Sequence, residues 1–80
     1  MTIPVDAPAR HPGQVLLRMR TVSRLSVEAA AQMAHMRPDA LRRLEAGKIR
    51  DRAACRRAAE AIGWMGATFD LAVASAVDLR

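Results

Sequence analysis

The sequence predicts a single all-α domain. Its 80 residues suffice for one small hydrophobic core. Alanine dominates the apolar half of the composition, which includes one Trp, one Phe and no Tyr, and this favours closely packed helices over a sheet. Apolar residues also recur at helical spacing between proline and glycine stops. We therefore expect five helices around a thin core, which a second subunit would help to cover.

The chain is expected to begin with an extended, flexible arm. Residues 1–12 contain three prolines and show little periodicity, so they predict no helix. A first helix is expected over about residues 13–23. Its inner side would carry Leu16, Met19 and Val22.

The start of the second helix is predicted from its cap. The hydroxyl of Ser26 can accept a hydrogen bond from the free backbone N–H groups of a first turn, and Glu28 suits the positive end of the helix dipole. The core-facing residues of this helix would be Ala30, Ala31 and Ala34.

A third helix is predicted to begin with a proline, whose missing N–H costs nothing in a first turn. Leu41 and Leu44 are three residues apart and would anchor its inner face. Arg42 and Arg43 must then project in other directions. Gly47 can adopt the left-handed conformation that ends a helix.

The fourth helix is expected after Asp51, a suitable N-cap. Cys55, Ala58, Ala59 and Ile62 follow the spacing of one helical face, so they predict a buried stripe. This spacing favours a core position for Cys55 over a reactive thiol.

The fifth helix, expected over residues 68–79, has an apolar arc wider than so small a core needs. We expect one edge of the arc to face the core and the other to face a second subunit. The expected dimer interface consists of Trp64, Phe69, Val73 and Val77. The alternative is a terminal helix that simply wraps around the core.

The net charge of +5 is concentrated in one segment. Residues 37–57 hold eight basic residues against three acidic ones, whereas the rest of the chain has five of each. Such a concentration of positive charge attracts phosphates, and this attraction weakens as the salt concentration rises. A solvated surface is the alternative for a basic run, but this run coincides with the exposed side of the third helix, which favours nucleic-acid binding.

A set of residues between positions 13 and 63 follows a known pattern. The set comprises Gly13, Leu16, Met19, Arg20, Leu25, Ser26, Glu28, Ala31, Leu41, Arg43, Leu44, Glu45, Gly47, Lys48, Ala59, Ile62 and Gly63. It resembles the lambda repressor and Cro type of helix-turn-helix protein, the XRE family. Members typically read as a glycine, Leu-x-x-Leu-Arg, Leu-Ser-Gln-Glu-x-Leu-Ala, a turn glycine, a serine-led helix with Ile-x-x-Ile-Glu-x-Gly-Lys, and a final Ala-x-x-Leu-Gly helix. The resemblance implies a five-helix DNA-binding domain over residues 13–80.

The resemblance also implies roles for individual residues. An arginine of the first helix and the glutamate that ends the third form an ion pair in the family, and these positions correspond to Arg20 and Glu45. The residues expected at the DNA backbone are Arg37, Lys48, Arg50 and Arg52.

The positions that contact bases in relatives correspond to Val27, Pro38, Asp39, Arg42 and Arg43. The two arginines are the strong candidates, because arginine can donate two parallel hydrogen bonds to guanine, worth about 1 to 3 kcal/mol of discrimination. Asp39 could accept a hydrogen bond from cytosine, or pair with Arg43 four residues later. We favour the pairing for Asp39.

Four departures from the family pattern remove polar DNA contacts or turn residues. Val27 replaces a glutamine, Arg37 a capping serine and Ala46 an asparagine. His35 replaces the turn glycine, although a histidine adopts a left-handed conformation less readily than glycine does. DNA contacts by the remaining surface would rely more on arginine. The DNA sequence that a relative binds therefore cannot be assumed for this chain.

These observations predict a homodimeric transcriptional repressor that reads an inverted repeat in double-stranded DNA, with its third helix in the major groove. The alternative is a non-enzymatic adaptor whose basic face binds an acidic protein.

Other functions find little support in the sequence. His11 and His35 have no adjacent nucleophile or carboxylate arrangement, and one cysteine with two distant histidines does not form a metal site, so no catalysis, metal or cofactor is expected. No small-molecule ligand is expected either. RNA binding is less well supported than DNA binding, because the sequence offers no aromatic platform on which bases could stack. No apolar run approaches the roughly 18 residues of a membrane span, and no signal peptide is evident, so we expect a cytoplasmic protein at the nucleoid.

Overall fold

The computed structural model describes the backbone of residues 11–78 and the side chains of residues 11–75. This part of the chain forms five α-helices and no strand, which confirms the all-α prediction. The helices are α1 (Pro12–Val22), α2 (Val27–Met33), α3 (Pro38–Glu45), α4 (Arg52–Ala61) and α5 (Gly66–Asp78). The predicted arm lies outside the described residues, apart from its last two positions.

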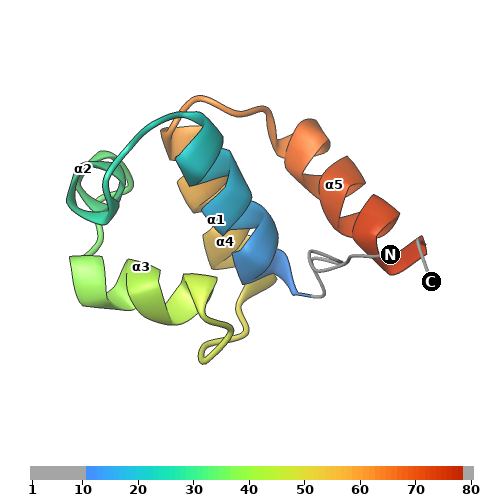
Figure 1. Ribbon diagram of the computed structural model, residues 1–80, viewed down its shortest axis with the longest axis horizontal. Helices are drawn as coiled ribbons and strands as arrows, with labels where there is room; N and C mark the ends of the chain where they lie inside the picture. Colours follow the sequence, from blue (N-terminus) through green and yellow to red (C-terminus); the bar gives the residue numbers. More distant parts are fainter. Residues whose placement is uncertain (1–10, 79–80) are drawn as a thin grey trace, which may run out of the picture.

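The helices α1 and α4 lie against each other in the middle of the molecule (Figure 1). The pair α2 and α3 covers one side of them, with α3 in contact with α1 and α2 in contact with α4. On the other side, α5 packs on both α1 and α4. The turn between α2 and α3 and the whole of α3 therefore stand apart from α5 (Figure 1).

The core combines larger apolar side chains from α1, α3 and α5 with alanines from α2 and α4. The largest side chains that are fully buried belong to Leu16, Leu41, Cys55 and Phe69. The predicted stripe of α4 is buried from Cys55 to Ile62. Because the buried side chains of α2 and α4 are small, the larger side chains of α1, α3 and α5 supply most of the buried apolar area.

The predicted caps of α2 and α4 are present. The Oγ of Ser26 accepts a hydrogen bond from the N–H of Ala29 at 3.0 Å. The Oδ1 of Asp51 accepts one from the N–H of Ala54, also at 3.0 Å. At α3, by contrast, Arg37 occupies the N-cap position without a side-chain cap, as its replacement of a serine led us to expect.

The start of α1 corrects the predicted arm. Pro12 is the first residue of the helix, and the Nδ1 of His11 accepts a hydrogen bond from the N–H of Gln14 at 3.2 Å. A proline fits this position because its fixed φ is already helical and it lacks a donor to satisfy. His11 and Pro12 thus belong to the start of α1 and not to an extended arm.

Val22 does not belong to the core. Its side chain is 68% exposed, because it is the last residue of α1 and no neighbouring helix covers it. Leu16 and Met19 are buried as expected.

The predicted dimer interface is wrong for two of its residues. Phe69 and Val73 are buried within this chain, since α5 fills the side of α1 and α4 that α2 and α3 leave open. Trp64 is half-buried and donates a hydrogen bond from Nε1 to the Oγ of Ser23 at 3.0 Å. The side chain of Val77 lies outside the described part of the chain. Among the described residues of α5, the large apolar side chain that is exposed is Leu71.

A close approach between α1 and α3 depends on Gly13. A Cβ at this position would overlap the carbonyl oxygen of Leu44. Because that oxygen belongs to a backbone that cannot move aside without displacing α3, only glycine fits here. The first turn of α1 and the last turn of α3 are therefore in direct backbone contact.

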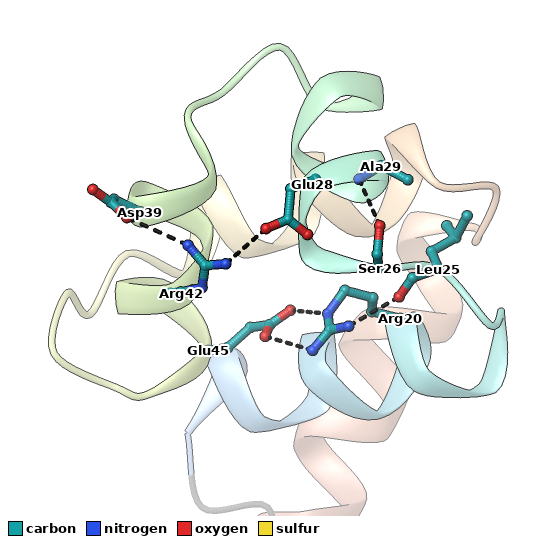
Figure 2. A network of polar contacts seen from close by, with 8 residues as sticks. All are labelled: Arg20, Leu25, Ser26, Glu28, Ala29, Asp39, Arg42 and Glu45. Carbon is teal, nitrogen blue, oxygen red and sulfur yellow. Dashed lines mark hydrogen bonds and ion pairs between the residues drawn. The ribbon is translucent and has the colours of Figure 1, made fainter.

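The same two helices are joined by a buried ion pair. The Nε of Arg20 lies 2.7 Å from the Oε2 of Glu45, and its Nη2 lies 3.1 Å from Oε1 (Figure 2). A further N–H of Arg20 donates to the carbonyl oxygen of Leu25 at 2.9 Å. The side chains are 16% and 7% exposed. This one arginine thus ties α1 to α3 and to the segment that enters α2, which is the pairing that the family resemblance implied.

Replacement of Glu45 by alanine should destabilise the domain by about 3 kcal/mol, because it leaves the Arg20 guanidinium buried without its partner. Chemical denaturation followed by circular dichroism measures this loss. The matched control is Glu60→Ala, which removes an exposed carboxylate paired with Arg56 on α4 and should cost less than about 1 kcal/mol. Equal losses for the two variants would refute the structural role of the buried pair.

The turn between α2 and α3 contains a strained residue. His35 adopts a left-handed conformation with φ of 57°, in the place where the family pattern has glycine. Replacement of His35 by glycine should stabilise the protein by about 1 kcal/mol, since a left-handed conformation costs a non-glycine residue about that much. In the control Gln32→Gly, the same residue enters the right-handed helix α2 and should destabilise by about 1 kcal/mol. Thermal melting of both variants tests the difference in sign.

Candidate nucleic-acid interface

The helix α3 has one buried side and one open side. Leu41, Leu44 and Glu45 are buried against the rest of the domain. At 3.6 residues per turn, the opposite side carries Asp39, Arg43 and Ala46, with Arg42 at its edge. All four are exposed. The sequence prediction that Arg42 and Arg43 project away from the core is confirmed.

Four exposed cations surround this open side without a partner in the part of the chain that the structure describes. Arg43 lies on α3, Arg37 directly precedes it, and Lys48 and Arg50 follow it. None of these side chains forms a hydrogen bond or ion pair there. Their charges are therefore available for an external anion.

The segment after α3 is fixed to the helix by its backbone. The N–H groups of Lys48 and Ile49 both donate to the carbonyl oxygen of Arg43, at 3.0 and 3.3 Å. Gly47 adopts φ of 80°, the left-handed conformation that the sequence predicted for a helix end. Lys48 is consequently held next to the last turn of α3. The exposed Ile49 lies beside it and was not predicted.

Arg42 differs from the other basic residues of this surface because it is paired. Its Nη2 lies 2.8 Å from the Oε2 of Glu28 on α2, and its Nη1 lies 3.4 Å from the Oδ1 of Asp39 (Figure 2). The predicted partner of Asp39, Arg43, is therefore wrong. Arg42 lies on the side of α3 that faces Glu28, so two carboxylates attract it together.

The charge of Glu28 is favoured by its surroundings. A backbone hydrogen bond at Glu28 and the hydrogen bond from Arg42 lower the pKa of its carboxyl group below the usual value. Sequence reasoning assigned Glu28 only to the helix dipole. No spacing rule could have found the pair, since its two residues are on different helices.

Arg52 does not stand free beside Lys48 and Arg50. Its Nη2 lies 3.3 Å from the Oδ1 of Asp70 on α5, and the Nε of Arg56 lies 3.1 Å from the other oxygen. Burial acts to raise the pKa of Asp70, but the hydrogen bonds from Arg52 and Arg56 outweigh it and lower the pKa overall. These two arginines pair with α5, so Arg52, which was predicted to contact the DNA backbone, is not free in the way that Lys48 and Arg50 are.

Cys55 is buried in the core. Burial, followed by the charges of Asp51 and Glu45, raises the pKa of the Cys55 thiol to about 11. Within residues 11–78, no three His, Cys, Asp or Glu side chains come together as metal ligands would. None of the five helices is both long and apolar enough to cross a bilayer. Cations surround the open side of α3, and the carboxylates of Glu28 and Asp39 lie among them.

Comparison with known proteins found no matching family model, no matching curated protein and no matching solved structure.

Proposed function

We propose that this protein is a sequence-specific regulator of transcription that binds double-stranded DNA. In this proposal α2, the turn and α3 form the helix-turn-helix of a lambda repressor-like domain, and α3 enters the major groove. The observation that supports it most is the orientation of α3: Leu41, Leu44 and Glu45 are buried, while cations without a partner among the described residues occupy its open side and both of its ends.

The chemistry of this surface suits DNA. A major groove is wide enough for an α-helix, and an arginine on that helix can donate to O6 and N7 of guanine. Arg43 is the reader that we propose first, with Arg42 beside it. Arg37, Lys48 and Arg50 would contact phosphates, which fixes the position of the helix on the duplex. Arg52 is left out of this set because it faces Asp70.

We further propose a homodimer that represses by occupying a promoter. A two-fold dimer would place two copies of α3 on one side of the duplex, so the operator would be an inverted repeat. Such a protein would act in the cytoplasm, at the nucleoid. Since Phe69 and Val73 are buried in one chain, the dimer would have to form through other residues.

Selection of bound fragments from random double-stranded DNA tests the function directly. Enrichment of a defined sequence is the expected result, and binding of that sequence is then measured against a scrambled duplex of equal length. If no sequence is enriched, the proposal is refuted, and the acidic-protein adaptor becomes the candidate to test.

Arg43→Ala should weaken binding to the selected sequence by about 1 to 3 kcal/mol and affect the scrambled duplex much less, because it removes a base contact. Lys48→Ala should weaken both complexes alike and reduce the salt slope of log K by about one unit. Fluorescence anisotropy at several salt concentrations measures both effects. Arg56→Ala is the matched control, because this arginine faces α5 and should change neither affinity. A selective loss in Lys48→Ala would show that the two roles are wrongly assigned.

Insertion of about five base pairs between the two halves of the operator should abolish tight binding. The half-sites would be centred about one helical turn apart, roughly 34 Å, and half a turn of added DNA rotates one of them to the other face. Addition of about ten base pairs is the control, since it restores the face. A protein that sediments as a monomer and binds its operator one to one would contradict the dimer and the inverted repeat.

A further inference from the structure

The ion pair between Glu28 and Arg42 links the two helices on either side of the turn. The residues are 14 positions apart in sequence, and the contact of 2.8 Å crosses from α2 to α3 (Figure 2). Asp39 approaches the same guanidinium from α3 itself, at 3.4 Å. Arg43, the next residue, forms no such pair within the described part of the chain.

We infer that Glu28 is a positioning residue that directs Arg42 to a base edge and away from phosphate, and that it thereby sets the specificity of DNA recognition. This inference rests on the proposed function. It assigns a role to an acidic residue in a surface that otherwise attracts DNA by its positive charge.

The first step of the argument is the geometry of the guanidinium. Arginine presents its N–H donors in a rigid, planar fork. Glu28 and Asp39 each occupy one donor of the fork, so other N–H groups remain for a ligand. Two contacts from two different helices restrict the orientation of the fork, so less rotamer freedom is lost when Arg42 binds DNA.

The second step is electrostatic. A phosphate that approached the Arg42 guanidinium would also approach two carboxylates, and like charges repel. A guanine edge offers two hydrogen-bond acceptors without a net charge, so it meets no comparable repulsion. The carboxylates thus weaken the attraction that does not depend on sequence more than the attraction that does.

The third step separates this role from a structural one. The side chains of Arg42 and Glu28 are 52% and 65% exposed, and ion pairs in contact with water contribute little to stability. Loss of the pair should therefore leave the fold intact. An effect on base preference would have to come from the orientation and charge of Arg42.

The test compares Glu28→Gln, Arg42→Ala and the double variant with the wild-type protein. Each is measured by anisotropy on the wild-type selected duplex and on a scrambled duplex, and each is also subjected to the random-DNA selection.

In Glu28→Gln, the ratio of the two affinities should fall about fivefold or more, with tighter binding to the scrambled duplex. The base position that loses preference should be the one that Arg42→Ala loses, and Glu28→Gln should have no further effect on the ratio in the Arg42→Ala background. The melting temperature should stay unchanged.

Glu60→Gln is the matched control, because it also neutralises an exposed carboxylate paired with an arginine, on α4. It should leave the affinity ratio at the wild-type value. If Glu28→Gln retains both the ratio and the base preference while the wild-type protein binds a selected sequence, the positioning role is refuted and the proposed function stands. If the wild-type protein selects no sequence, both are refuted.

Discussion

The position of α3 depends on one buried interaction, the ion pair between Arg20 and Glu45. Two charges taken out of water stabilise a structure only when their geometry satisfies both. Here the guanidinium donates to both carboxylate oxygens and to the carbonyl oxygen of Leu25. The backbone contact at Gly13, in the first turn of α1, also meets the last turn of α3. As a result, α3 has one orientation relative to α1, and the same residues always face outward.

The basic residues between positions 37 and 56 fall into two groups. Arg42, Arg52 and Arg56 pair with carboxylates on neighbouring helices. Arg37, Arg43, Lys48 and Arg50 lie on α3 or next to its ends and are exposed. The net charge therefore describes the surface less well than the pattern of pairs does. The helix α3 has cations at its ends and a partly neutralised arginine near its middle. In the proposed complex, phosphates and bases would therefore meet different charges on this helix, and a selective DNA-binding surface needs that difference.

Local signals in the sequence predicted most of the fold. The cap at Ser26, the cap at Asp51 and the left-handed glycine at position 47 act within a few residues of the chain, so they could be identified without tertiary information. The buried stripe of α4 followed from periodicity alone. The prediction failed where burial depends on how many helices share a core: Phe69 and Val73 were assigned to a second subunit, but they fill the space beside α1 and α4 in the same chain.

The sequence by itself determined the helices, the caps of α2 and α4, and the end and inner face of α3, because propensity, capping and periodicity are properties of neighbouring residues. It also pointed to Arg20 and Glu45 through the family resemblance. Only the tertiary structure decided which cations are free. Arg42 and Glu28 meet across a turn, and Arg52 meets Asp70 across two helices. Ion pairs depend on distances of a few ångströms between side chains far apart in sequence, and those distances are fixed only when the helices pack.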